Sequence, residues 1–171
     1  VQRVNEHQRG LLAQRLVQRL GESLVGHRIA VWGLAFKPGT DDLREAPSLA
    51  IIDELLRRGA QVRAFDPVAM PGVAARYAGH SGLELVDSPL AAAEGASALL
   101  IVTEWREFRS PDFAALITSM KQPLVLDGRN LYDPAFMQQM GFDYVGIGRS
   151  SAPQPPVQAA WPQARLQALA A

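Results

Sequence analysis

The sequence predicts an α/β fold, namely a doubly wound, mainly parallel, Rossmann-like sheet preceded by a long amphipathic helix. Short apolar runs alternate with segments of helical periodicity along most of the chain. The intervals between these runs suit crossover connections between parallel strands. With 171 residues and 48% apolar content, the chain can also bury the sizeable core of a single domain.

Leucines recur at three- and four-residue spacing near the start of the chain. They predict an amphipathic helix from Val4 to about Val25, which Gly26 would terminate. One interpretation is a helix that covers the edge of the sheet. The other makes residues 1–25 the end of a longer helix that joins this domain to a preceding one.

The first strand is predicted from Arg28 to Leu34, an apolar run that contains Gly33 near its end. A polar loop follows, and the next helix is predicted from Ser48, an N-cap candidate, to Arg58. A strand, a glycine-containing polar loop and a helix form the arrangement with which α/β proteins hold phosphates.

The same patterns place the remaining elements of a domain that spans residues 26–148. Further strands are predicted at 61–65, 83–86, 98–102, 124–126 and 144–147, and helices at 70–77, 88–94, 112–120 and 134–140. The composition then shifts to Ala, Pro and Gln, and we expect residues 149–171 to form a poorly ordered tail.

Composition excludes several classes of function. Lys and Arg together number 17, as do Asp and Glu, so no net field favours nucleic acid or a membrane surface. The chain has no cysteine, hence no disulfide, thiolate metal site or cysteine nucleophile. His7, His27 and His80 share no spacing with carboxylates, so no metal site is expected. Because no signal peptide or membrane-spanning run is evident, we expect a cytoplasmic protein.

Candidate ligand contacts gather at the predicted carboxyl ends of the strands, where doubly wound folds bind ligands. They are Phe36 and Lys37, Asp66, Thr103 and Glu104, and Asp127 and Arg129. Two cations at one edge suit a pyrophosphate. Structural alternatives exist for each: Lys37 as a solvated lysine, an ion pair of Arg129 with Asp127 or Asp133, Asp66 as a turn former, and Thr103 and Glu104 as caps.

An ordinary NAD-binding domain needs G-x-G-x-x-G directly after its first strand and an acidic residue about 20 positions further on. Here only Gly33 and Gly39 are present, five bulky residues apart, and Asp66 lies too far along the chain. The dinucleotide fingerprint is therefore absent.

The segment from Gly33 to Ser48, GLAFKPGTDDLREAPS, resembles the signature of the C-terminal domain of UDP-glucose 6-dehydrogenases, within the UDP-glucose/GDP-mannose dehydrogenase family. Supporting matches are AFDP at 64–67, VTEWREF at 102–108 and DGRN at 127–130. The start of the chain, Val4-Asn5 followed by Gln8, resembles the end of the central helix that links the two halves and carries the dimer contact.

The resemblance implies that Phe36, Lys37 and Arg129 contact UDP-glucose and that Arg44 reaches NAD across a cleft. It implies a homodimer, and an NAD-dependent oxidation of UDP-glucose to UDP-glucuronate in two steps through a cysteine thiohemiacetal. Since this chain has neither cysteine nor fingerprint, we expect the nucleophile and the main NAD site in an N-terminal half outside it. Two alternatives stay open: a dehydrogenase of UDP-N-acetylmannosamine or GDP-mannose, and a non-catalytic nucleotide-binding or dimerisation module.

Overall fold

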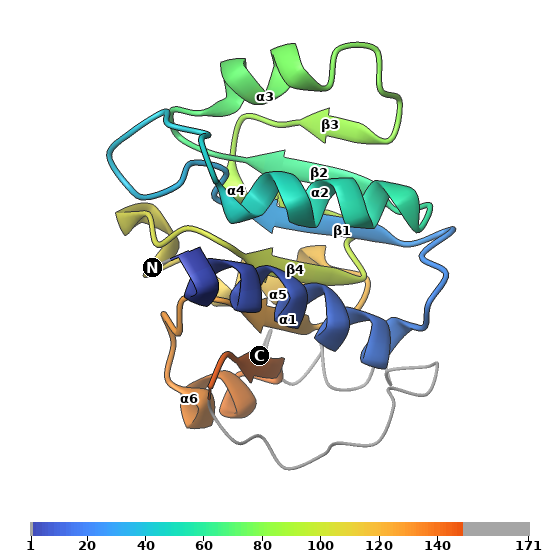
Figure 1. Ribbon diagram of the computed structural model, residues 1–171. Helices are drawn as coiled ribbons and strands as arrows, with labels where there is room; N and C mark the ends of the chain where they lie inside the picture. The colour runs from blue at the N-terminus through green and yellow to red at the C-terminus, as the bar shows by residue number, and fades with distance from the viewer. Residues whose placement is uncertain (1, 149–171) are drawn as a thin grey trace.

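Six parallel strands form one sheet in the order β3-β2-β1-β4-β5-β6, in a computed structural model that describes the backbone of residues 2–148 and the side chains of residues 10–148 (Figure 1). The strands are β1 Arg28–Trp32, β2 Gln61–Phe65, β3 Leu83–Leu85, β4 Ala98–Ile101, β5 Leu124–Asp127 and β6 Asp143–Gly146. The predicted fold class is confirmed. The strand order reverses between β1 and β4, which is the switch point where such sheets bind ligands. The predicted tail lies outside the described residues.

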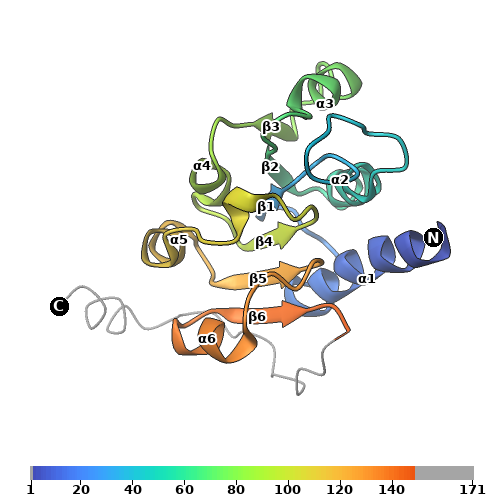
Figure 2. The ribbon, with the colours of Figure 1, turned by 90° about the vertical axis from the view of Figure 1, so that its left-hand side faces the viewer.

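Helices cover both faces of the sheet. They are α1 Gln2–Leu20, α2 Pro47–Arg57, α3 Met70–Arg76, α4 Pro89–Ala93, α5 Phe113–Ser119 and α6 Pro134–Gln139, with a 3₁₀ turn η1 at Arg106–Phe108. Figure 2, viewed toward the carboxyl ends of the strands, shows α1 and α2 on one face and α4 and α5 on the other. Side chains of β1 alternate between two cores: Ile29 and Val31 face α1 and α2, and Trp32 faces Phe108 of η1.

Helix α1 ends earlier than the leucine pattern predicts. It stops at Leu20, because Gly21 adopts φ +95°, a left-handed conformation typical of helix ends. The predicted terminator, Gly26, lies in the turn that leads into β1. Leu12 and Leu16 are fully buried in the core, so α1 covers the sheet of its own domain.

The boundaries of β1 and α2 also differ from the prediction. Strand β1 ends at Trp32, because Gly33 turns the backbone with φ +90° although the apolar run continues. Helix α2 starts at Pro47, a residue favoured in the first turn, with Ala46 as its N-cap. Ser48 is therefore not the cap, and its buried hydroxyl instead donates to the Leu34 carbonyl at 2.5 Å.

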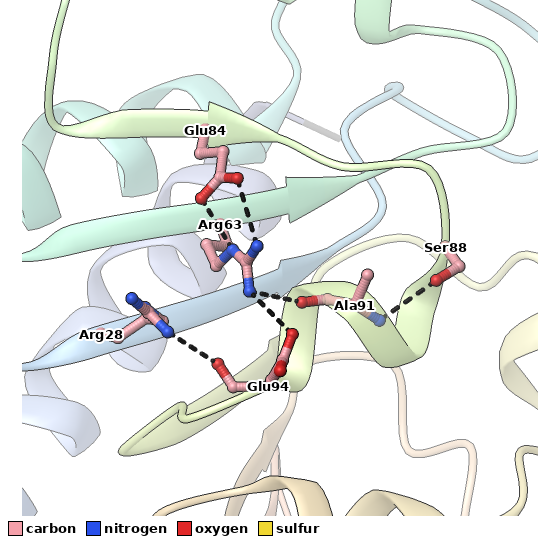
Figure 3. A network of polar contacts seen from close by, with 6 residues as sticks. All are labelled: Arg28, Arg63, Glu84, Ser88, Ala91 and Glu94. Carbon is pink, nitrogen blue, oxygen red and sulfur yellow. Dashed lines mark hydrogen bonds and ion pairs between the residues drawn. The ribbon is translucent and has the colours of Figure 1, made fainter.

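A network of charges joins β2 and β3 to α4 on the face opposite α1 (Figure 3). The Arg63 guanidinium donates to both Glu84 oxygens, at 2.8 and 3.1 Å, and to the Ala91 carbonyl at 3.0 Å. It also forms an ion pair with Glu94, whose carbonyl accepts a hydrogen bond from Arg28. These two arginines are thus held by their own domain and serve its architecture.

Candidate functional site

The loop from Gly33 to Ala46 connects β1 to α2 at the carboxyl edge of the sheet (Figure 1). Its base is fixed by Asp66, a fully buried residue directly after β2. One oxygen, Oδ2, accepts the backbone N–H groups of Leu34 and Ala35 at 2.7 and 3.0 Å. The other, Oδ1, accepts those of Val68 and Ala69 at 2.9 and 2.8 Å. Asp66 therefore forms the predicted turn and, in addition, anchors the start of the loop between β1 and α2.

Two buried hydroxyl groups hold the carbonyls of the same two residues. Ser48 donates to Leu34, as described above, and Thr103 donates to the Ala35 carbonyl at 2.7 Å. Every backbone polar group of Leu34 and Ala35 is thus paired with a side chain from another segment. Because all backbone hydrogen-bonding groups at the base of the loop are paired, this base is rigid. The next two residues therefore extend from a fixed position.

Phe36 and Lys37 follow this support directly. Phe36 is half-buried, and its N–H donates to the Asp42 carbonyl at 2.8 Å, which closes the loop between them. Lys37 is exposed, and no carboxylate of a described residue forms an ion pair with it. The Lys37 ammonium is consequently available to an anionic ligand.

Arg44 lies further along the loop and is paired within it. Its guanidinium binds the Asp42 carboxylate at 2.8 Å and is 90% exposed. The hydrogen bond from Arg44 is the main cause that lowers the pKa of Asp42 to about 2. Arg44 thus stands at the outer surface of the loop, away from the buried base.

Arg129 lies after β5 and forms a two-point ion pair that the sequence analysis did not foresee. Nη2 donates to Glu104 Oε1 at 2.5 Å, and Nε contacts Oε2. Asp127, one of the two predicted partners, instead accepts the backbone N–H of Arg129 at 2.8 Å, together with the Leu131 N–H and the Tyr144 hydroxyl. Asp133, the second predicted partner of Arg129, is instead the N-cap of α6.

Trp105 is a site residue that sequence reasoning missed. Its indole N–H donates to Asp66 Oδ2 at 3.0 Å, which joins the segment after β4 to the loop after β1. Beside it, burial and then the charge of Asp66 raise the pKa of Glu107. The signal was present in the quoted run VTEWREF, in which an aromatic residue follows the apolar strand, but its partner could not be read from local spacing.

The structure brings all four predicted contact residues to one edge of the sheet but not into mutual contact. Phe36, Lys37 and Arg44 lie on the loop after β1, whereas Arg129 follows β5, with β4 between the two strands. Two strand spacings amount to about 10 Å. Such a separation suits a ligand with two charged groups or a phosphate chain, rather than a single small ion.

The loop after β1 lacks the dinucleotide fingerprint, because its glycines are Gly33 and Gly39. Gly33 occupies the place of the first fingerprint glycine, and a Cβ there would lie 2.5 Å from the Thr103 Cβ, so this position accepts no side chain. No group of three potential metal ligands occurs among residues with described side chains. None of the described helices is long and apolar enough to cross a bilayer.

A parallel sheet with a rigid polar loop at its switch point and two cations along one edge defines a nucleotide-binding α/β domain. Residues 30–134 match the UDP binding domain of the UDP-glucose/GDP-mannose dehydrogenase family. The chain belongs to this family.

Relatives and solved structures agree with this assignment. The chain is 56% identical to a UDP-glucose 6-dehydrogenase of Pseudomonas aeruginosa, over 86% of this chain and 33% of that protein. It is 39% identical to the Rhizobium meliloti enzyme, over 85% and 33%. The structure of a UDP-glucose dehydrogenase from Pyrobaculum islandicum matches with a TM-score of 0.63 and 35% identity, over 74% of this chain and 27% of that one. The chain thus spans about a third of the length of these curated relatives.

Proposed function

We propose that this chain is the UDP-sugar-binding part of an NAD-dependent UDP-glucose 6-dehydrogenase, with Phe36, Lys37 and Arg129 in contact with UDP-glucose. The 56% identity to a UDP-glucose 6-dehydrogenase, over most of this chain, supports the choice of sugar nucleotide. In this proposal the chain alone is inactive, because it has no cysteine to form the thiohemiacetal. The family resemblance also favours a cytoplasmic enzyme of polysaccharide biosynthesis.

One observation carries the proposal: Lys37, on a loop whose base is fully hydrogen-bonded, and Arg129, after β5, are two cations at the same edge of the sheet. Lys37 is exposed without an ion-pair partner among the described residues. Among the described residues, Glu104 binds the Arg129 guanidinium along one side, and the Arg129 side chain is 33% exposed. Both can therefore form charge-assisted hydrogen bonds with the diphosphate or the sugar, and Phe36 can pack against the ligand beside them.

In this proposal, NAD binds outside the UDP-sugar site. Arg44 is the one residue of this chain that we propose for NAD contact, from across an interdomain cleft. Its exposed guanidinium at the outer side of the loop is compatible with that role. A single exposed arginine already paired with Asp42 gives little affinity by itself, so the isolated chain should bind NAD weakly or not at all.

A second candidate substrate has structural support. The structure of a UDP-D-ManNAc dehydrogenase from Pyrococcus horikoshii matches this chain with a TM-score of 0.61 and 32% identity, over 86% of this chain and 31% of that one. Both substrates share the UDP group, so this edge of the sheet would bind either. The sugar would then be selected mainly by parts outside this chain.

We further propose a homodimer formed through α1. Leu12 and Leu16 point into their own domain, so the contact would use a different face of the helix. A hollow between α1 and α2 offers such a face; its lining combines small or apolar residues, among them Ala13, Val17 and Ala50, with the polar Gln14, Glu54 and Arg58. The small residues would let a second helix approach, and Glu54 and Arg58, which already pair with each other, would border the contact.

Calorimetric titration of the 171-residue chain with UDP tests the assignment of the site. Lys37→Ala and Arg129→Ala should each weaken UDP binding about tenfold, since each removes a charge-assisted hydrogen bond. Arg44→Ala is the matched control: it removes an exposed cation from the same loop and should leave UDP affinity unchanged. Equal affinity of all four proteins would remove Lys37 and Arg129 from the site.

A further inference from the structure

We infer that Glu104 is a positioning residue for the UDP-sugar site: it holds the Arg129 guanidinium along one edge and leaves the other edge to the ligand. The inference rests on the proposed function, because it requires that Arg129 contacts the UDP-sugar. It assigns to Glu104 a role other than that of a cap or a competing ion-pair partner.

Glu104 occupies one of the two hydrogen-bonding edges of the Arg129 guanidinium. A guanidinium has five N–H donors, four of which form two edges: a side edge of Nε and Nη2, and an end edge of Nη1 and Nη2. Glu104 takes the side edge, with Oε1 against Nη2 and Oε2 against Nε. The end edge forms no hydrogen bond with a described residue. Arg129 can therefore keep its carboxylate partner and bind two ligand oxygens at once.

Glu104 is itself held by its two neighbours in the chain. The Thr103 hydroxyl is bound to the Ala35 carbonyl, and the Trp105 indole is bound to Asp66. Glu104 lies between these two anchored residues, and its side chain is only 26% exposed. Its buried Oε2 atom contacts Arg129 Nε but forms no hydrogen bond with a described residue. Among the described residues, Glu104 forms its hydrogen bond and ion pair with Arg129. This carboxylate is thus held in place and can fix the position of the long Arg129 side chain.

The backbone of Arg129 is equally constrained. Its N–H is bound to Asp127, and the N–H of Gly128 donates to the Ile101 carbonyl of β4 at 2.9 Å. Only the rotatable bonds of the side chain remain to be ordered, and the ion pair orders them before a ligand arrives. Ordering a side chain in advance removes part of the entropic cost of binding.

Two physical effects of Glu104 oppose each other, which makes the test decisive. As a carboxylate it screens the charge of Arg129, and removing it would strengthen anion binding if screening were its main effect. As a positioning residue it orders the guanidinium, and removing it would weaken binding. The sign of the change in UDP affinity therefore distinguishes positioning from screening.

The experiment is a double-mutant cycle on the 171-residue chain, titrated with UDP at one salt concentration. Glu104→Ala should weaken binding about three- to tenfold, and Glu104→Gln, which keeps one acceptor for Arg129 but turns the other oxygen into an NH₂ donor, should restore only part of the loss. In an Arg129→Ala background, Glu104→Ala should have no further effect, because the partner through which it acts is absent. Tighter binding by Glu104→Ala, or an equal loss in both backgrounds, would overturn the inference.

A second variant tests the edge assignment without changing Glu104. Arg129→Lys keeps the charge but offers no second edge, so it should bind UDP nearly as weakly as Arg129→Ala. Affinity close to that of the wild type would contradict the inference. If Arg129→Ala leaves UDP binding unchanged, the proposed site fails; if it weakens binding but Glu104→Ala does not, only the role of Glu104 fails.

Discussion

Gly33 and Thr103 lie so close that a Cβ atom on residue 33 would stand 2.5 Å from the Thr103 Cβ and 2.6 Å from its backbone nitrogen. Gly33 also adopts φ +90°, a conformation that other residues rarely adopt. The loop after β1 can leave the sheet at this point only because residue 33 has no side chain. The Thr103 hydroxyl then reaches the Ala35 carbonyl behind it.

Gly33→Ala should therefore destabilise the fold severely. We expect the free energy of unfolding to fall by more than about 2 kcal/mol, because backbone strain and a clash add. Gly21→Ala is the matched control, since Gly21 has φ +95° but no atom of a described residue within 4 Å of its Cβ position. It should cost only about 1–2 kcal/mol. Urea unfolding measures both. Equal losses would show that the contact with Thr103 has no effect.

Asp66→Asn should destabilise the fold and loosen the loop base. The substitution turns one acceptor oxygen into an NH₂ donor, which then faces buried N–H groups that Asp66 now pairs. We expect a loss of about 3 kcal/mol. Asp41→Asn, an exposed change in the same loop, should stay within about 0.5 kcal/mol. An Asp66→Asn protein as stable as the control would refute the role assigned to this carboxylate.

Stability at alkaline pH should depend on Tyr132. Burial raises the pKa of this phenol, so the folded state keeps its proton while the unfolded state releases it above pH about 10. Stability is thus present below that pH and falls as pH rises, by up to about 1.4 kcal/mol per pH unit. Tyr132→Phe should show a shallower decline in urea unfolding between pH 9 and 11. Tyr77, whose pKa is raised to about 12, is common to both proteins. Parallel curves would exclude this linkage.

The proposed dimer predicts that one half-buried residue of α1 controls association. Val17→Glu should shift a dimer to a monomer in sedimentation velocity, because it replaces an apolar side chain by a carboxylate in a hollow that already contains Glu54 and that the second helix would cover. Gln18→Glu adds the same charge at the next, exposed position and should leave association unchanged. Leu12 and Leu16 are unsuitable for this test, since their substitution would disrupt the core. A wild-type chain that is monomeric at high concentration would contradict a dimer formed by this chain alone.

The sequence predicted the type and order of the elements because periodicity reports directly which side chains are buried. It misplaced boundaries where a glycine turns the backbone inside a continuing apolar pattern. Leu34 is as buried as the strand residues before it, so the apolar run gives no sign that β1 has ended at Trp32. Likewise Leu24 is buried beyond the end of α1 and extends the leucine pattern past Gly21.

The sequence could predict at which edge of the sheet the candidate site lies, but not which side chains pair there. Parallel strands bring their carboxyl ends together, so the placement of Lys37 and Arg129 at one edge followed from the fold. The pairs that organise the edge join residues of different strands: Arg129 with Glu104, 25 positions apart, and Trp105 with Asp66, 39 positions apart. Spacing along the chain favoured the neighbouring aspartates for Arg129, and only the strand order reveals that Glu104 is nearer.

The most direct test of the account compares two ligands on the same protein. The 171-residue chain is titrated with UDP-glucose and with NAD at one salt concentration, and NADH absorbance is followed with both present. The account predicts measurable binding of UDP-glucose, weak or no binding of NAD, and no formation of NADH, because Phe36 and Lys37 present side chains where a dinucleotide loop would present backbone amides. Tight binding of NAD without binding of UDP-glucose would contradict it.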